Sequence, residues 1–456
     1  MLNRIFRNKY LLLSLQFFTL IVFVLLIYGS IGIATDDASF AKILRNTNLP
    51  NLIVWSYWWP IIIASAIIFG RYWCSICPME LITSFFGKIG FRNKPSNFMK
   101  SGWIITLFYA IVLILGIHTF AIHRIPQYMA IYMLVLFATA VIVGLIWEKR
   151  TFCTHVCPIG HLLGLYSLLS FNKLGVKDTD VCKNCKTKDC ISKANHYKFN
   201  ARSCTSELYP PMISNNSDCI LCGQCFKSCT KDNVIIQKRR FAADLFTNIS
   251  LRWSEIAFFM IVSGFVVYEL LSEWSVSKEI VMTIPNYING SLGILGSAKG
   301  TVKAIILFVI LPLIFFSIFG ILKKIVANEK WKSAFNQLVL ALLPIAASMH
   351  LLKAILKTTS RIPYWEFVVS DPSGVESATK IMSNPELVKN NYLINILAPS
   401  IDVISVVLPI LGLFLSILVI IKQAHNNISS RVISFIAASL YVLIFIITML
   451  EWRWLY

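Results

Sequence analysis

The stretch FGRYWCSICPME, residues 69–80, places two cysteines and a proline directly after the uncharged run of residues 51–70. Further along the chain the pattern returns as EKRTFCTHVCPIGH, residues 148–161. Proline has no amide hydrogen and disfavours helix at the residue before it. The two stretches therefore predict that two spanning helices each stop at a cysteine pair, with the thiols at the membrane surface.

The composition predicts an integral membrane protein. Of the 456 residues, 57% are hydrophobic and 14% are charged, whereas soluble domains carry about a quarter charged residues. Several uncharged runs exceed the length of about eighteen residues that marks a spanning helix. We expect a mainly α, polytopic transmembrane protein, and the first span is interpreted as a retained anchor. Nine spans are expected, near residues 10–34, 51–70, 102–122, 128–147, 256–272, 304–322, 334–352, 398–421 and 432–450.

The basic residues predict the orientation in the membrane. They gather at the N-terminus, in the loop after the second span and in the long segment 148–255. The positive-inside rule then places the N-terminus in the cytoplasm and the C-terminus outside. The same bias accounts for the net charge of +20. We therefore expect membrane lipid, and no nucleic acid, as a partner.

Three parts are expected along the chain. Residues 1–171 form a four-helix membrane unit that holds both cysteine–proline stretches. Residues 172–250 form a small, cysteine-rich cytoplasmic insert, and residues 251–456 form a second membrane unit of five helices. All twelve cysteines lie between Cys74 and Cys229. In the cytoplasm thiols stay reduced, which favours metal ligands over disulfides.

The strongest motif is CILCGQCFKSC, residues 219–229. Its cysteine spacing is that of bacterial ferredoxins, in which the first three cysteines hold one 4Fe–4S cluster and the fourth holds another. Thr230 stands where a proline usually follows. Zinc or a pair of disulfides is the alternative, but zinc sites rarely use four cysteines this close together.

A first ferredoxin half precedes this motif in VCKNCKTKDC, residues 181–190. The next cysteine, Cys204, comes fourteen residues after Cys190. We interpret the extra residues as an insertion that moves the fourth ligand without removing it. Crosswise ligation then predicts two 4Fe–4S clusters. One would be held by Cys182, Cys185, Cys190 and Cys229, and the other by Cys204, Cys219, Cys222 and Cys225.

The two cysteine–proline pairs form a further candidate metal site. If their helices are neighbours, Cys74, Cys77, Cys153 and Cys157 converge at the membrane surface. Four thiolates favour a soft site, which is iron–sulfur, zinc or copper(I). A redox-active dithiol pair and structural cysteines are the alternatives. His155 is either a further ligand or a local hydrogen-bonding group.

Three histidines lie near the outer ends of predicted spans: His118, His123 and His350. They are open to three interpretations: ligands of haem b, a quinone site, or interfacial histidines with local hydrogen bonds. No pair shares one helix at the spacing that a haem requires, so haem is unsupported by the sequence. The chain has no P-loop and no dinucleotide-binding glycine fingerprint.

The chain resembles the NapH/NosR family of membrane 4Fe–4S ferredoxin-type proteins. The resemblance lies in two spanning helices that each end in a C-x2/3-C-P pair, followed by a two-cluster ferredoxin insert. The related CcoG-type proteins are similar. The resemblance covers residues 50–235, and the pair Cys74 and Cys77 has one residue fewer between its cysteines than the usual three. It implies electron transfer between the quinone pool, or a cytoplasmic donor, and a respiratory reductase or its maturation system. It also implies a bacterial inner (cytoplasmic) membrane location, a redox protein partner, and a role as subunit of a quinol-linked oxidoreductase.

Two other functions remain open. A CcoG-like assembly factor would use the cysteine–proline thiols to bind or reduce copper for another enzyme. A redox-sensing scaffold would hold clusters without turnover.

Overall fold

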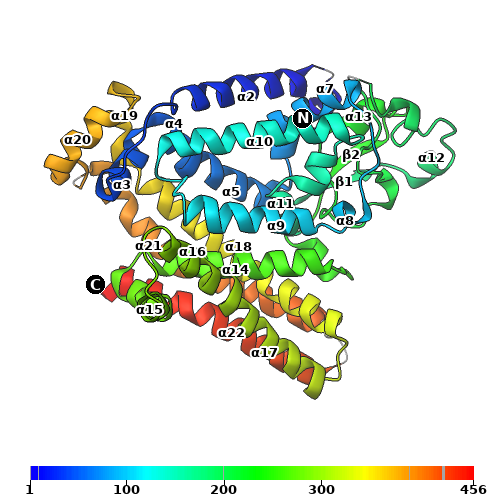
Figure 1. Ribbon diagram of the computed structural model, residues 1–456. Coiled ribbons are helices and arrows are strands. Elements are labelled where there is room, and N and C mark those ends of the chain that lie inside the picture. The colour runs from blue at the N-terminus through cyan, green and yellow to red at the C-terminus, as the bar shows by residue number, and fades with distance from the viewer. Residues whose placement is uncertain (1, 9, 199, 390, 424–426, 456) are drawn as a thin grey trace. The chain divides into compact units, whose positions relative to one another are not determined.

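The computed structural model describes residues 2–8, 10–198, 200–389, 391–423 and 427–455. The chain is mainly helical, as predicted, and two short strands, β1 and β2, pair with each other. Figure 1 shows the elements coloured along the chain.

Within the described ranges, eight helices are long and apolar enough to cross a membrane. They confirm a polytopic helical membrane protein. The span predicted near residues 102–122 is a shorter apolar helix, Trp103–Ile117. The eight candidate spans are Leu11–Tyr28, Leu49–Phe69, Pro126–Ile146, Trp253–Leu271, Ala298–Val326, Trp331–Ser370, Tyr392–Gln423 and Ile428–Trp454.

The contacts within the chain divide it into two compact units. Unit 1 consists of Met1–Tyr28, Ala64–Phe108 and Ile131–Thr247, and unit 2 of Gly29–Ile63, Tyr109–Ala130 and Asn248–Tyr456. All twelve cysteines belong to unit 1. The division into residues 1–171, 172–250 and 251–456 stays a prediction.

Unit 1 contains the short helices around the cysteines and both strands. Three of its helices, α5, α9 and α10, also contribute residues to unit 2. Its elements are α1 (Leu2–Arg7), α2 (Leu11–Tyr28), α5 (Trp59–Phe69), α6 (Trp73–Ile76), α7 (Pro78–Ile89), α8 (Asn97–Lys100), α9 (Trp103–Ile111), α10 (Pro126–Ile146), η3 (Phe152–Val156), α11 (Gly160–Ser167), β1 (Asn172–Val176), α12 (Thr179–Lys183), η4 (Lys193–Asn195), η5 (Pro210–Met212), α13 (Gln224–Ser228), β2 (Val234–Lys238) and η6 (Ala243–Phe246).

The spanning helix α5 ends within one residue of the predicted span 51–70, but at a different stop signal from the predicted one. Its last residue is Phe69, and Gly70 follows with φ +90°, a left-handed conformation that glycine adopts without steric cost. The first cysteine pair lies beyond this turn, around the separate short helix α6. Pro78 then begins α7, and Cys77 before it is extended, as the residue before a proline prefers. The prediction that proline stops the spanning helix is therefore wrong, because Gly70 already ends it.

The insert is built on the antiparallel pair β1–β2, which runs from Asn172 opposite Lys238 to Val176 opposite Val234. Leu174 and Ile236 face one core together with Leu221 and Phe226. The N-terminal helix α1 completes this core, because the ring of Phe6 stacks on Phe226 at a centroid distance of 5.3 Å.

Gly223, in the cysteine motif, has φ +74°, and a Cβ there would lie 2.6 Å from the Phe6 ring. Glycine thus allows α1 to pack directly on the cysteine loop.

Unit 2 is a bundle of long helices with short helices at the ends of its spans. Ser416 on α21 donates a hydrogen bond to the carbonyl oxygen of Ala341 on α18 (2.6 Å), which ties two of the spans together. The elements of unit 2 are α3 (Ala38–Thr47), α4 (Leu49–Leu52), η1 (Ile53–Trp58), η2 (Val112–Ile117), α14 (Trp253–Leu271), α15 (Ser275–Ser291), α16 (Ala298–Ile305), η7 (Ile306–Ile310), α17 (Leu311–Val326), α18 (Trp331–Thr359), η8 (Ile362–Tyr364), α19 (Trp365–Ser370), α20 (Val375–Ser383), η9 (Pro385–Val388), α21 (Tyr392–Gln423), α22 (Ile428–Leu450) and η10 (Glu451–Leu455).

Candidate functional site

The twelve cysteines of unit 1 gather in three groups of four. We call them quartet A (Cys182, Cys185, Cys190 and Cys229), quartet B (Cys204, Cys219, Cys222 and Cys225) and quartet C (Cys74, Cys77, Cys153 and Cys157). None of the twelve is in a disulfide.

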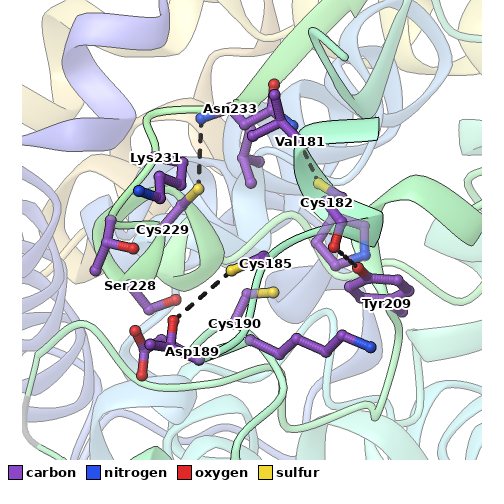
Figure 2. A pocket seen from close by; sticks show the side chains of 15 residues that line it. Val181, Cys182, Cys185, Asp189, Cys190, Tyr209, Ser228, Cys229, Lys231 and Asn233 are labelled. Carbon is purple, nitrogen blue, oxygen red and sulfur yellow. Dashed lines mark hydrogen bonds between the residues drawn. The ribbon is translucent and has the colours of Figure 1, made fainter. Parts of the chain in front are cut away.

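Quartet A lines a cavity between α12, the loop after it and the end of α13 (Figure 2). Asn233 binds two of its sulfurs. Its side-chain amide donates to Cys182 Sγ at 3.0 Å, and its backbone N–H donates to Cys229 Sγ at 3.4 Å. The Tyr209 hydroxyl donates to the carbonyl oxygen of Cys182 at 2.7 Å. The cavity holds about 390 Å³ of space, including open solvent.

Quartet B lines a second cavity, whose other walls are mostly apolar and include Leu174, Leu208 and Leu221. The extra residues after Cys190 form a loop that returns to its start, since the backbone N–H of Cys204 donates to the carbonyl oxygen of Cys190 at 2.6 Å. This bond places Cys204 beside the first ferredoxin half, although its side chain lines the cavity of quartet B. The structure thus groups the eight cysteines as crosswise ligation would require.

Burial opposes ionisation of most of these thiols. It raises the pKa of Cys190 and of Cys219 to about 12, and that of Cys225 well above its usual value. Burial also acts to raise the pKa of Cys222, but Arg150 and Arg202 outweigh it and the pKa is lowered. Thiolates are the ligating form, so a bound cation or cluster would supply the positive charge that these buried sites lack.

Quartet C lies where α6 and η3 meet the start of the two proline-led segments. Burial is the main cause that raises the pKa of Cys77, and the charges of the other three cysteines add to it. Burial likewise raises the pKa of Cys153 to about 12 and that of Cys157 to about 11. The structure therefore brings together all four cysteines of the two cysteine–proline pairs.

Three arginines lie between quartets B and C. Arg71 acts electrostatically on Cys153 and on Cys219. Arg150 acts electrostatically on Cys153 and on Cys222.

The third arginine, Arg202, interacts electrostatically with both Cys222 and Cys153. Quartet A in turn adjoins quartet B, because the charge of Cys190 reaches Cys225. The quartets therefore adjoin in the order A, B, C.

A single buried carboxylate holds two of these arginines. Glu80, on the first turn of α7, forms ion pairs with Arg150 and Arg202. Gln16 on α2 donates a hydrogen bond to the same carboxylate, and its amide also donates to the Ser75 carbonyl at 3.0 Å. Sequence reasoning missed Glu80 and Arg202. The one signal was the place of Glu80, an acid three residues after Cys77.

Single-ion binding has no geometrical support in the described residues: among them, no three or more His, Cys, Asp or Glu side chains are arranged to hold one metal ion. A group of several atoms, such as an iron–sulfur cluster, would have to fill the space between the sulfurs of a quartet.

The three histidines singled out in the sequence belong to unit 2, apart from the cysteines. The rings of His118 and His350 pack against Phe308 (4.9 Å) and Phe265 (6.0 Å) respectively. His123 accepts a hydrogen bond from Arg124 at 3.1 Å. Haem b gains no support from these contacts.

Comparison with known proteins points to the same chemistry. Residues 51–96 and 129–177 match a family described as a 4Fe-4S binding domain. No curated protein and no solved structure matches the chain. The two matched segments hold the two halves of quartet C, which are the cysteine–proline pairs. The match supports iron–sulfur cluster binding, while the narrower NapH/NosR assignment stays a prediction.

Proposed function

We propose that this protein is a membrane-bound iron–sulfur electron-transfer protein with clusters at all three quartets. Quartets A and B would each hold a 4Fe–4S cluster, and quartet C a third iron–sulfur site. The observation that carries the proposal is the grouping of twelve cysteines into three adjoining sets of four. When bound, such clusters supply one-electron transfer.

The protein side chains provide the setting for that chemistry. Arg71, Arg150 and Arg202 would offset the negative charge of the thiolates at quartets B and C. Asn233 donates hydrogen bonds to two sulfurs of quartet A, a contact that tunes cluster potential. The mostly apolar walls of quartet B would limit the access of water to a bound cluster.

The partners follow from the resemblance and from the position of quartet C beside spanning helices. We propose that electrons pass between the quinone pool, or a cytoplasmic donor, and a respiratory reductase or its maturation system. The protein would serve as a subunit of a quinol-linked oxidoreductase in the bacterial inner membrane, with its clusters on the cytoplasmic side. A redox protein is the expected partner at the far end of the path.

Metal analysis and EPR spectroscopy of the full chain, purified without oxygen, test the proposal. We expect about four iron and four sulfide per quartet, hence about twelve of each per chain. Chemical reduction should produce EPR signals from interacting clusters. Iron-free protein would overturn the proposal. Copper at quartet C in place of iron would favour the assembly-factor function, and full clusters with no electron exchange would favour the sensor.

A further inference from the structure

A third cavity of unit 1 lies beside quartet B at the N-terminal end of α2. It holds about 380 Å³ of space, including open solvent. Apolar side chains of α2 and α7 form part of its lining: Leu12, Leu13, Leu81 and Phe85. α2 is a candidate membrane span, and the Phe85 side chain is 53% exposed. The cavity therefore has an apolar side that a lipid-soluble molecule can approach.

The remaining lining is polar, and its half-buried members are Ser84, Asn200 and Lys227. Glu80 and Arg202 are 2% and 5% exposed, and both line the cavity with Gln16. Ser84 donates a hydrogen bond to the Glu80 carboxylate at 3.2 Å. The Nε of Arg202 is buried and has no hydrogen-bond partner among the described residues. An unsatisfied buried donor is costly, so a ligand with an acceptor oxygen would stabilise this site.

The polar lining includes a residue of the quartet B motif. Gln224 lines the cavity and stands between Cys222 and Cys225 in the sequence. Its side-chain oxygen accepts a hydrogen bond from the backbone N–H of Arg202 at 3.4 Å. Arg202 in turn lies within electrostatic reach of Cys222 in quartet B and Cys153 in quartet C. A molecule bound to Arg202 would therefore contact a side chain that interacts with cysteines of both quartets.

We propose that this cavity binds the head group of a quinone, with its tail leaving past Leu13 and Phe85 into the lipid. The proposal rests on the proposed electron-transfer function and gives it a location. A ring oxygen would accept a hydrogen bond from the Nε of Arg202. In the quinol form a ring hydroxyl would donate to Glu80. Oxidation of a quinol releases two electrons and two protons. Clusters at quartets B and C, when bound, would take up the electrons one at a time, the Glu80 carboxylate would accept one proton, and solvent at the open side of the cavity would take the other.

A phospholipid head group fits the cavity less well. Its phosphate would meet the carboxylate of Glu80, and like charges in a buried site repel strongly. The two guanidinium groups nearest to that carboxylate are already paired with it, and Lys227 is the further cation in the lining. A neutral ring with acceptor oxygens avoids this repulsion.

Photolabelling of the full chain in lipid nanodiscs with an azido-quinone tests the proposal. We expect the label on peptides of α2 and α7, and we expect a short-chain quinone, but not excess phosphatidylglycerol, to displace it. Leu13→Trp fills the cavity and should lower labelling at least about tenfold, which corresponds to 1.4 kcal/mol. Leu15→Trp is the matched control, because Leu15 lies on the same helix, is 37% exposed and does not line the cavity.

A second pair of variants covers the case in which Leu13→Trp fails to fold. Phe85→Glu puts a charge at the apolar side of the cavity and should also abolish labelling. Phe91→Glu, at a residue that is 81% exposed and outside the cavity, should not. Labelling elsewhere, displacement by the phospholipid, or normal labelling of both cavity variants would overturn the proposal. Iron and sulfide are measured in the same samples. If the unaltered protein contains full clusters but takes up no label, this inference alone is wrong. If the unaltered protein contains no iron, the proposed function is wrong.

Discussion

Arg150 and Glu80 form an ion pair whose side chains are only 1% and 2% exposed. Arg202 binds the same carboxylate. Because Arg150 and Arg202 both act on Cys222, one acid on α7 positions the positive charge between quartets B and C. The Glu80–Arg202 pair thus connects α7 to the segment between β1 and β2.

Removal of the Glu80 charge should destabilise unit 1. Glu80→Gln leaves two buried guanidinium groups without their counter-charge, and breaking a buried pair costs roughly 3–5 kcal/mol. The apparent melting temperature of the purified chain should fall clearly. Glu207→Gln is the control, because Glu207 pairs with Lys149 while its own side chain is 68% exposed. Such surface pairs contribute about 0–1 kcal/mol. Equal melting temperatures for the two variants would contradict the structural role of Glu80.

Asn233 should tune the potential of quartet A. Asn233→Ala removes the side-chain donor to Cys182 Sγ and leaves the backbone donor to Cys229. Hydrogen bonds to sulfur stabilise the more negative, reduced state, so we expect a lower reduction potential for one cluster. A shift on the order of 60 mV corresponds to a tenfold change in a one-electron equilibrium. Potentiometric EPR titration measures it. Asn184→Ala, at an exposed neighbour of Cys185, should leave all potentials in place.

Gly223→Ala should weaken the packing of α1 on the cysteine loop. The new Cβ would lie 2.6 Å from the Phe6 ring, and the left-handed φ adds strain. Overpacking costs about 1–3 kcal/mol, and a non-glycine residue in the left-handed region about 1–2 kcal/mol. Gly293→Ala separates the two effects, because Gly293 has φ +61° with open space around it. If both variants lose the same stability, contact with Phe6 plays no part.

Serine replacement should remove one cluster at a time. Cys74→Ser is expected to lower the iron content by about four atoms per chain while the signals of quartets A and B persist. Cys182→Ser should instead remove the signals of quartet A and leave quartet C intact. Iron and sulfide analysis with EPR distinguishes the two variants. Unchanged iron in Cys74→Ser would rule out a cluster at quartet C.

The grouping of the cysteines followed from the sequence, because the spacing within each motif is a local property. Spacing alone predicted that Cys204 joins Cys219, Cys222 and Cys225, and the structure places all four around one cavity. The helical membrane architecture followed from the uncharged runs.

The surroundings of the thiols were not readable, because they depend on contacts between distant segments. No pattern near Glu80 in the sequence predicts its ion pair with Arg202, which lies 122 residues further along the chain. The stop signal of α5 was assigned to the proline for a related reason. A proline is a visible stop signal, whereas the left-handed turn at Gly70 lies where a Cβ would come within 3.2 Å of Ser170 Oγ, 100 residues further along the chain.

The stacking of Phe6 on Phe226 has a consequence for biogenesis. The ribosome releases Phe6 early, whereas Phe226 emerges only after several hydrophobic segments have been handed to the membrane machinery. Helix α1 therefore cannot pack on the cysteine loop until that loop has been synthesised. Any metal that binds the neighbouring cysteines before α1 packs would bind a site that still lacks part of its apolar surroundings.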